Sequence, residues 1–178
     1  MIETERLRLR PWREADKPAF HDLVNTPAMM THFGGVQPRD QIDALIDAQI
    51  ALQEQDGHCM WAVELHDGTL TGICGVRVQC TYSGLPVNGE LETGWRIGER
   101  WWGAGIAREA AAASIAWGFA NTHFPRVLAW TGQANTRSWG LMERLGMRRR
   151  ADLDFHHPRY AADDAIGAMI VYGIDRPA

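Results

Sequence analysis

The chain has 178 residues, of which 46% are hydrophobic and 22% charged, so it is long enough for one folded domain and unlike a disordered protein. Its formal net charge of −4 lacks the basic character of a nucleic-acid-binding protein. No apolar run approaches the roughly 18 residues of a membrane helix, and the charged start of the chain is unlike a signal peptide. We therefore expect a cytoplasmic protein with neither membrane nor nucleic-acid partners.

Apolar residues recur with the period of a helix or a strand in successive segments, separated by glycine, proline and polar turn residues. In chain order they predict a strand (5–12), two helices (15–24 and 38–57), three strands (59–65, 70–80 and 90–97), a helix (106–121), a strand (126–131), a helix (135–145) and two strands (147–155 and 165–174). This order predicts an α+β fold in a single domain spanning residues 1–178. We expect a mixed central sheet of about six to seven strands, flanked by about four helices.

Neither the cysteines nor the histidines form a recognisable disulfide or metal pattern. Cys59, Cys74 and Cys80 are odd in number and lack metal-ligand spacing, so we expect reduced, buried thiols. His156 and His157 have no cysteine or acidic residue at a spacing that would complete a site. We therefore expect no metal.

The segment 100–110, RWWGAGIAREA, lies between a predicted strand and the first turn of a predicted helix. Glycines let a ligand approach the backbone, and the first N–H groups of a helix lack internal partners and carry positive potential. Together these features favour an anion site for phosphate or pyrophosphate, to which Arg108 could add a side chain. A plain connecting loop explains the glycine spacing about equally well. The Walker and dinucleotide-binding patterns are absent.

Several segments together resemble one known family over nearly the whole chain. They are 4–12 (TERLRLRPW), 92–97 (ETGWRI), 102–110 (WGAGIAREA), Asn135-x-x-Ser138, 142–147 (MERLGM) and His157-Pro158. In order and spacing they resemble the GNAT superfamily of acetyl-CoA-dependent N-acyltransferases. The most similar branch is the RimJ/RimL-like one, which includes enzymes that acetylate the N-terminal amines of ribosomal proteins.

The resemblance implies where acetyl-CoA, the acyl-donor cosubstrate, binds. The family's pyrophosphate loop has the form Gln/Arg-x-x-Gly-x-Gly/Ala. In one frame Gly105 and Ala107 fill the small positions and Trp102 takes the Gln/Arg position, as is common in this branch; a second frame, Arg100-x-x-Gly103-x-Gly105, also matches. The implied cradle is the backbone of Trp102, Gly103, Ala104, Gly105, Ile106 and Ala107.

The resemblance also implies how the pantetheine arm is held. Backbone groups of Trp95 and Ile97 would bind it where their strand parts from the strand at 126–131, and Gly94 is well placed there for a bulge. Asn135 matches the asparagine that bonds the arm in the family. A helix cap is the simpler role for Asn135, and both roles can hold together.

One position departs from the family pattern. Many relatives have a tyrosine seven residues after the asparagine, where it acts as general acid toward the thiolate, whereas this chain has Met142. The RimJ/RimL-like branch implies Ser138 as the substitute. A first-turn serine without a catalytic role explains Ser138 about equally well.

The chemistry of amine acetylation calls for a base, because an amine attacks a thioester only when neutral and its pKa is about 8 to 10.4. Glu90 and Glu92 alternate onto one face of the strand that leads into the loop. Glu92 matches the branch's Glu-x-Gly-aromatic pattern, so we favour it, with Glu90 second. Two solvated strand acids without a catalytic role are the alternative.

The sequence therefore predicts an N-acetyltransferase that moves an acetyl group from acetyl-CoA to a primary amine by direct attack. The acceptor amine is a peptide N-terminus or a small molecule, which we expect the segments 26–37, 83–89 and 156–164 to select. A non-catalytic acyl-CoA-binding sensor or scaffold is the alternative, and Met142 favours it. We also consider a homodimer.

Overall fold

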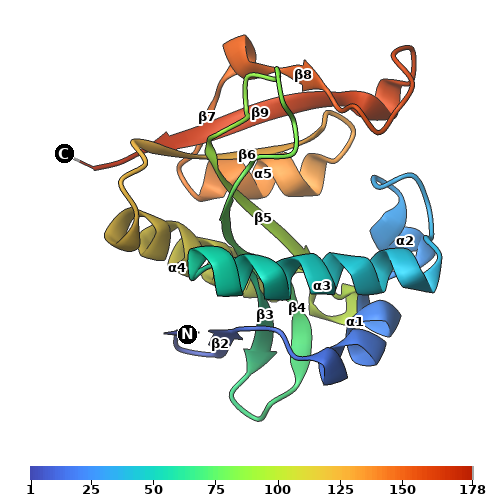
Figure 1. Ribbon diagram of the computed structural model, residues 1–178, viewed down its shortest axis with the longest axis vertical. Helices are drawn as coiled ribbons and strands as arrows, with labels where there is room; N and C mark the ends of the chain where they lie inside the picture. The colour runs from blue at the N-terminus through green and yellow to red at the C-terminus, as the bar shows by residue number, and fades with distance from the viewer. Residues whose placement is uncertain (178) are drawn as a thin grey trace.

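A nine-stranded sheet organises residues 1–177, the part of the chain that the computed structural model describes (Figure 1). Its strands are β1 (Ile2–Glu3), β2 (Leu7–Arg10), β3 (Met60–Leu65), β4 (Leu70–Val78), β5 (Leu91–Ile97), β6 (Arg126–Gly132), β7 (Arg148–Arg149), β8 (Phe155–His156) and β9 (Ala168–Asp175). They lie in the order β1-β2-β3-β4-β5-β6-β9-β7, and β8 also pairs with β9. Among the described residues only β5 and β6 pair in parallel. The expected mixed sheet is confirmed, with more strands than the expected six or seven.

Helices cover both faces of this sheet. They are α1 (Lys17–Val24), α2 (Pro27–Met30), α3 (Arg39–Asp56), α4 (Ile106–Asn121) and α5 (Thr136–Arg144). α1 and α3 pack against each other on one face, and Leu23 of α1 fills the space above Gly98. α4 lies on the opposite face, where its Gly118 contacts Leu91 and Val76. α5 packs on β6 and β9 through Met142.

The strand that the sequence predicts at 147–155 is interrupted in the structure. β7 and β8 are its two ends, and a 3₁₀ turn at Ala151–Leu153 separates them. Between the two pairings the chain advances from Arg149 to Phe155 while β9 moves only from Tyr172 to Met169. The surplus residues cannot be paired, so they leave the sheet as a turn. The two-residue strand β1 and the one-turn helix α2 are additional elements that the sequence did not predict.

The sheet divides into two arms beside β5. β5 and β6 pair only at Leu91 with Val127 and at Glu92 with Leu128. Beyond this point β5 continues along β4 to Ile97, whereas β6 continues along β9. In Figure 1, β6, β9 and α5 form the upper arm, while β2, β3 and β4 form the lower one. The only parallel pairing in the described sheet therefore ends in a fork.

Gly94 does not form the bulge that its position suggested. Its pairing with Gly75 belongs to an unbroken register between β4 and β5, and the one register shift near it lies in β3, between Val63 and Glu64. The glycine instead leaves space. A Cβ at Gly94 would lie 3.4 Å from the methyl group of Met60. The fork therefore arises from the divergence of β6, with no extra residue in β5.

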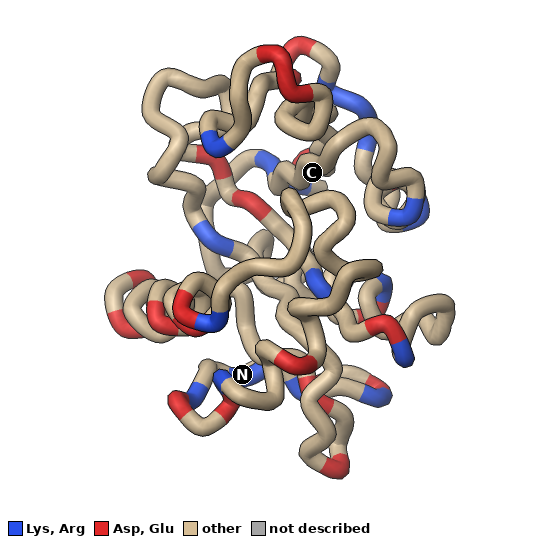
Figure 2. Tube along the Cα trace, turned by 90° about the vertical axis from the view of Figure 1, so that its right-hand side faces the viewer, with Lys and Arg blue, Asp and Glu red and all other residues tan. Residues whose placement is uncertain are grey.

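Charged residues of both signs are spread over the fold (Figure 2). Helix α3, seen nearly end-on at the left of Figure 2, carries Asp40, Asp43, Asp47, Glu54 and Asp56. Part of the net negative charge therefore lies on one helix. Within residues 1–177, no helix is both long enough and apolar enough to cross a membrane.

Candidate active site

The fork leaves one edge of β5 without a strand partner. Gly98 N–H donates to Thr71 O, so the even-numbered positions of β5 direct their backbone groups toward β4. Trp95 and Ile97 are odd-numbered, and their backbone groups therefore point to the side from which β6 has turned away. The carbonyl of Ile97 accepts the indole N–H of Trp102 at 2.6 Å. Trp95 and the N–H of Ile97 are thus directed into the fork.

The loop after β5 turns through two glycines in the left-handed region. The φ angle is +76° at Gly103 and +81° at Gly105, a conformation that favours glycine. Gly105 is the N-cap of α4, whose first residue is Ile106. This start corresponds to the motif frame in which Gly105 and Ala107 fill the small positions.

The amide groups of this loop differ in what they bind. The N–H groups of Trp102 and Ala104 donate within the loop, to Glu99 and Trp101. The four other N–H groups of the segment 102–107, those of Gly103, Gly105, Ile106 and Ala107, donate to no acceptor in residues 1–177. Free amides at the positive end of a 16-residue helix form a site for an anion.

Arg6 fixes this loop from the start of the chain. Its Nη1 donates to Ala104 O at 2.9 Å, and its Nε donates to the carboxylate of Glu109 at 2.6 Å. The hydroxyl of Thr4 donates to the same carboxylate at 2.6 Å. Burial raises the pKa of Glu109, but the hydrogen bonds from Thr4 and Arg6 outweigh it and hold the pKa below its usual value of 4.5. Nothing in the local sequence pattern predicted this contact.

We expect Glu109→Gln to lower the free energy of unfolding by about 1–2 kcal/mol at pH 7, because the bonds to a charged acceptor weaken. The folded-state pKa of Glu109 is depressed, so its contribution is present above the unfolded-state pKa and is lost as the pH falls through the folded-state pKa. Urea unfolding at pH 7 and below pH about 4 measures the difference. A gap between variant and wild type that does not shrink at acid pH would contradict this account.

Asn135 begins α5 and forms a side-chain cap. Its Oδ1 accepts the N–H of Ser138 at 3.3 Å, and its Nδ2 donates to the hydroxyl of Thr131 at 3.1 Å. The hydroxyl of Ser138 forms no hydrogen bond to any residue in 1–177 and is partly exposed. Met142 is buried against Ala129, so its side chain belongs to the packing beneath α5. Ser138 therefore offers a free hydroxyl at the start of α5, whereas Met142 has no proton to donate.

Glu92 lies at the base of the fork with its two oxygens in different surroundings. Its Oε2 accepts Arg77 Nε and Gln79 Nε2, each at 3.0 Å. Its Oε1 accepts no hydrogen bond from residues 1–177 and lies 3.9 Å from the position of a Cβ on Gly94. One oxygen therefore anchors the side chain while the other borders the space above Gly94.

Glu90 is less well placed than Glu92 to act as a base. Arg126 occupies both of its oxygens, with Nη2 at 2.5 Å from Oε1 and Nε at 3.1 Å from Oε2. Glu90 also precedes the fork, since Leu91 is the first residue of β5 that pairs with β6. Its carboxylate ties β6 to the start of β5.

The thiols lie apart from any activating group. Cys59 and Cys74 are buried, and burial raises the pKa of each to about 12, so neither is a nucleophile at neutral pH. Cys80 is exposed, which contradicts the expectation that all three are buried. In residues 1–177, no three His, Cys, Asp or Glu side chains gather in a way that could hold a metal ion.

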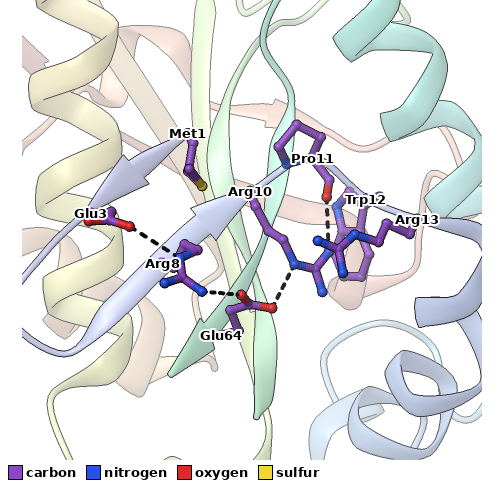
Figure 3. A pocket seen from close by; sticks show the side chains of 8 residues that line it. All are labelled: Met1, Glu3, Arg8, Arg10, Pro11, Trp12, Arg13 and Glu64. Carbon is purple, nitrogen blue, oxygen red and sulfur yellow. Dashed lines mark hydrogen bonds and ion pairs between the residues drawn. The ribbon is translucent and has the colours of Figure 1, made fainter. Parts of the chain in front are cut away.

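A hollow on the outer edge of the sheet is lined by Arg8, Arg10, Trp12 and Glu64 (Figure 3). Glu64 lies between the two arginines and accepts from Arg8 at 3.2 Å and from Arg10 at 2.7 Å. Arg10 also donates to both oxygens of Asp16. These charges pair within the protein, and the hollow lies on β2 and β3, away from the fork.

The three segments that the sequence analysis assigned to acceptor selection meet in space. Arg159 Nη2 donates to Gln37 Oε1 at 2.6 Å, and the ring of Tyr160 lies 3.5 Å from the position of a Cβ on Gly34. Tyr82, which directly precedes the segment 83–89, lies with its hydroxyl 2.7 Å from His157 Nε2. These contacts bring residues from three distant parts of the chain together.

Residues 6–148, which contain the fork and the α4 loop, match the family described as the acetyltransferase (GNAT) domain. The chain belongs to this family. It is 29% identical over 154 residues to the uncharacterized N-acetyltransferase p20 of Bacillus licheniformis, covering 83% of this chain and 82% of that protein. It is 28% identical over 148 residues to the uncharacterized protein YkkB of Bacillus subtilis, covering 82% of this chain and 84% of that protein.

Solved structures of GNAT proteins share the fold. An acetyltransferase from Agrobacterium tumefaciens C58 is 28% identical with a TM-score of 0.77, covering 97% of this chain and 92% of that one. RimL, a ribosomal L7/L12 alpha-N-protein acetyltransferase solved with coenzyme A, has a TM-score of 0.75 at 17% identity, covering 97% and 95%. The expected likeness to RimL is therefore confirmed for the fold. This GNAT protein is an acetyl-CoA-dependent N-acetyltransferase.

Proposed function

We propose that this enzyme transfers the acetyl group of acetyl-CoA to a primary amine by direct attack, using a single catalytic domain that spans residues 1–178. One observation carries the proposal. The edge of β5 that β6 leaves open runs from Glu92 to the free amides at the start of α4. An acyl donor bound along this edge would present its thioester beside a carboxylate. No metal takes part in the proposed reaction.

The residues of the fork fit the parts of acetyl-CoA. The free amides of Gly103, Gly105, Ile106 and Ala107 suit its pyrophosphate, because they combine unused donors with the positive end of α4. Trp102 and Ala104 would shape that cradle, since their own amides bind within the loop. Trp95 and Ile97 would pair with the pantetheine arm as an added strand does. Asn135 caps α5 and would also bind the pantetheine arm from the start of that helix.

In the proposed mechanism Glu92 removes the proton of the acceptor amine. Oε1 of Glu92 borders the space above Gly94 and has no donor from residues 1–177, so it can accept that proton directly or through one water. Arg77 and Gln79 hold the other oxygen and fix the orientation of the carboxylate. The neutral amine then attacks the thioester carbon of acetyl-CoA. The acetyl group passes to the amine, and coenzyme A leaves as the thiolate. Positioning the two reactants accounts for a further part of the rate.

Ser138 is proposed to assist the departing thiolate with a hydrogen bond from its free hydroxyl. We expect Ser138→Ala to lower kcat about tenfold, the effect of losing one hydrogen bond to a charged group, with a nearly unchanged KM for acetyl-CoA. Thr136→Ala removes an exposed hydroxyl from the same helical turn and serves as the control. Steady-state kinetics on both variants make the comparison. Equal activity of Ser138→Ala and wild type would remove Ser138 from the mechanism.

The direct test is the release of coenzyme A thiol from acetyl-CoA in the presence of a panel of amines, followed by mass spectrometry of the products. The panel includes peptides with free N-termini, because RimL is named for acetylating one, and small-molecule amines. Transfer to any amine supports the proposal. Cofactor binding without transfer to any of them would instead support the acyl-CoA-binding alternative. Sedimentation with and without acetyl-CoA tests whether the protein forms a homodimer, and cell fractionation tests the predicted cytoplasmic location.

A further inference from the structure

Arg96 is unlike the other arginines of the described chain. Each of the others pairs with a carboxylate, donates to backbone carbonyls as Arg176 does, or is exposed to solvent. Arg96 is half-buried, and its side chain forms no ion pair and no hydrogen bond with any residue in 1–177. A shielded guanidinium without an acceptor is costly unless a ligand supplies one.

The surroundings of Arg96 increase that cost. Its guanidinium lies 3.9 Å from the ring centroid of Phe33, which offers a cation–π contact but no hydrogen-bond acceptor. Burial, together with the positive charges of Arg77 and Arg159, lowers the pKa of Arg96 to about 10. An anion at this place would relieve both the desolvation and the repulsion between the arginines.

The position of Arg96 relates it to Glu92. Even-numbered side chains of β5 share one face, so Glu92, Gly94 and Arg96 follow one another along it. Gly94 has no side chain, and the groups that border its open position are Glu92 Oε1 at 3.9 Å and the sulfur and methyl of Met60 at 3.9 and 3.4 Å. The strand therefore presents a carboxylate, an open floor and a guanidinium in succession.

Loops close over the Arg96 end of this floor. Arg159 joins the C-terminal loop to Gln37, which follows Phe33 in the loop after α2. The ring of Tyr160 lies against the same loop at Gly34. Enclosure by these contacts favours an acceptor that is small, with its anionic group a few bonds from its amine.

We propose that the acceptor is a free amino acid or a close analogue, with its amine at Glu92 and its carboxylate at the guanidinium of Arg96. The proposal rests on the proposed function, which places the acceptor amine at Glu92. A planar guanidinium binds a carboxylate through two parallel hydrogen bonds, so it recognises shape as well as charge. Arg159 adds positive potential at the entrance, where its side chain is exposed.

The test compares each of a set of α-amino acids with its own α-carboxamide, which keeps the amine and side chain but lacks the anion. We expect kcat/KM for the acids to exceed that for the amides by about tenfold or more, the size of a charge-assisted hydrogen bond. Arg96→Gln should bring this ratio close to one by lowering activity on the acids alone. Arg148→Gln removes an exposed arginine of β7 and should leave the ratio unchanged. Arg96→Lys keeps the charge and should retain part of the preference.

Each outcome decides the proposal. If Arg96→Gln lowers kcat/KM for acids and amides by the same factor, Arg96 does not bind the carboxylate, while acetyl transfer stands. The same conclusion follows if the wild-type enzyme acetylates peptides but no free amino acid. If no amine is acetylated, the proposed function fails, and calorimetric binding of acid and amide to the coenzyme A-bound protein replaces the kinetics. Acid-selective binding that Arg96→Gln abolishes would still support the anion site, and equal binding of both would overturn it. Circular dichroism confirms that each variant folds.

Discussion

Replacing Glu92 with glutamine is expected to lower kcat/KM for the acceptor about a hundredfold to a thousandfold at pH 7, the range of general base catalysis. Glutamine keeps the shape of the side chain and its contact with Arg77, but it cannot take a proton. The acceptor amine must then lose its proton to water before it attacks. Because the neutral fraction of an amine rises tenfold with each pH unit below its pKa of about 8 to 10.4, the loss should shrink at high pH.

The pH profile separates a base from a structural residue. If Glu92 is the base, the pH optimum of the Glu92→Gln variant should be higher than that of wild type. If the substitution merely destabilises the site, the rate should fall by the same factor at every pH. Glu90→Gln is the matched control, since Glu90 precedes the fork and its oxygens are bound to Arg126. A larger loss in Glu90→Gln than in Glu92→Gln would transfer the role to Glu90. An unshifted profile in Glu92→Gln would end its candidacy as a base.

The local parts of the site could be predicted from the sequence because they depend on neighbouring residues. The run of glycines before an alanine-rich segment predicted where α4 begins, and its bounds in the structure are those expected, Ile106–Asn121. Asn135 at the start of the predicted helix predicted the cap of α5, which the structure shows. Alternation along β5 placed Glu92 on a defined face. In each case the signal is a spacing of a few residues.

The partners of these residues could not be predicted, because they come from far along the chain. Arg6 and Glu109 are separated by 103 residues, and nothing in local periodicity connects them. Glu92 receives Arg77 only through the register of β4 and β5, and the long loop between those strands does not specify a register. In the sequence Arg96 is an ordinary strand arginine, because Phe33 and the C-terminal loop, which surround it in the structure, are far away along the chain.

The expected strand at 147–155 shows a further limit of periodicity. The hydrophobic pattern continues through Met147, Leu153 and Phe155, and all three side chains are buried as a strand would require. The pairing with β9 nevertheless leaves no room for the residues between Arg149 and Phe155. The two ends of the predicted strand therefore pair with β9, while its continuity was wrong. Backbone pairing depends on the partner strand, which the pattern of one segment does not contain.

A carboxylate placed in the loop before α4 provides the strongest test of the pyrophosphate cradle. Gly103 has φ at +76° and open space around it, since a Cβ there would meet no atom within 4 Å. Asparagine and aspartate have nearly the same shape and both tolerate this backbone region better than other residues. The pair Gly103→Asn and Gly103→Asp therefore differs in charge alone.

We expect the Kd for acetyl-CoA to rise about thirtyfold to 150-fold more in Gly103→Asp than in Gly103→Asn, because one negative charge near the pyrophosphate costs about 2–3 kcal/mol at an effective dielectric constant near 20. The melting temperatures of the two variants should agree closely, since aspartate is not disfavoured near the positive end of a helix. Raising the ionic strength should narrow the difference in Kd, because salt screens charges at an exposed loop. Equal affinities of the two variants at low salt would show that the pyrophosphate binds elsewhere, and the free amides of α4 would then need another role.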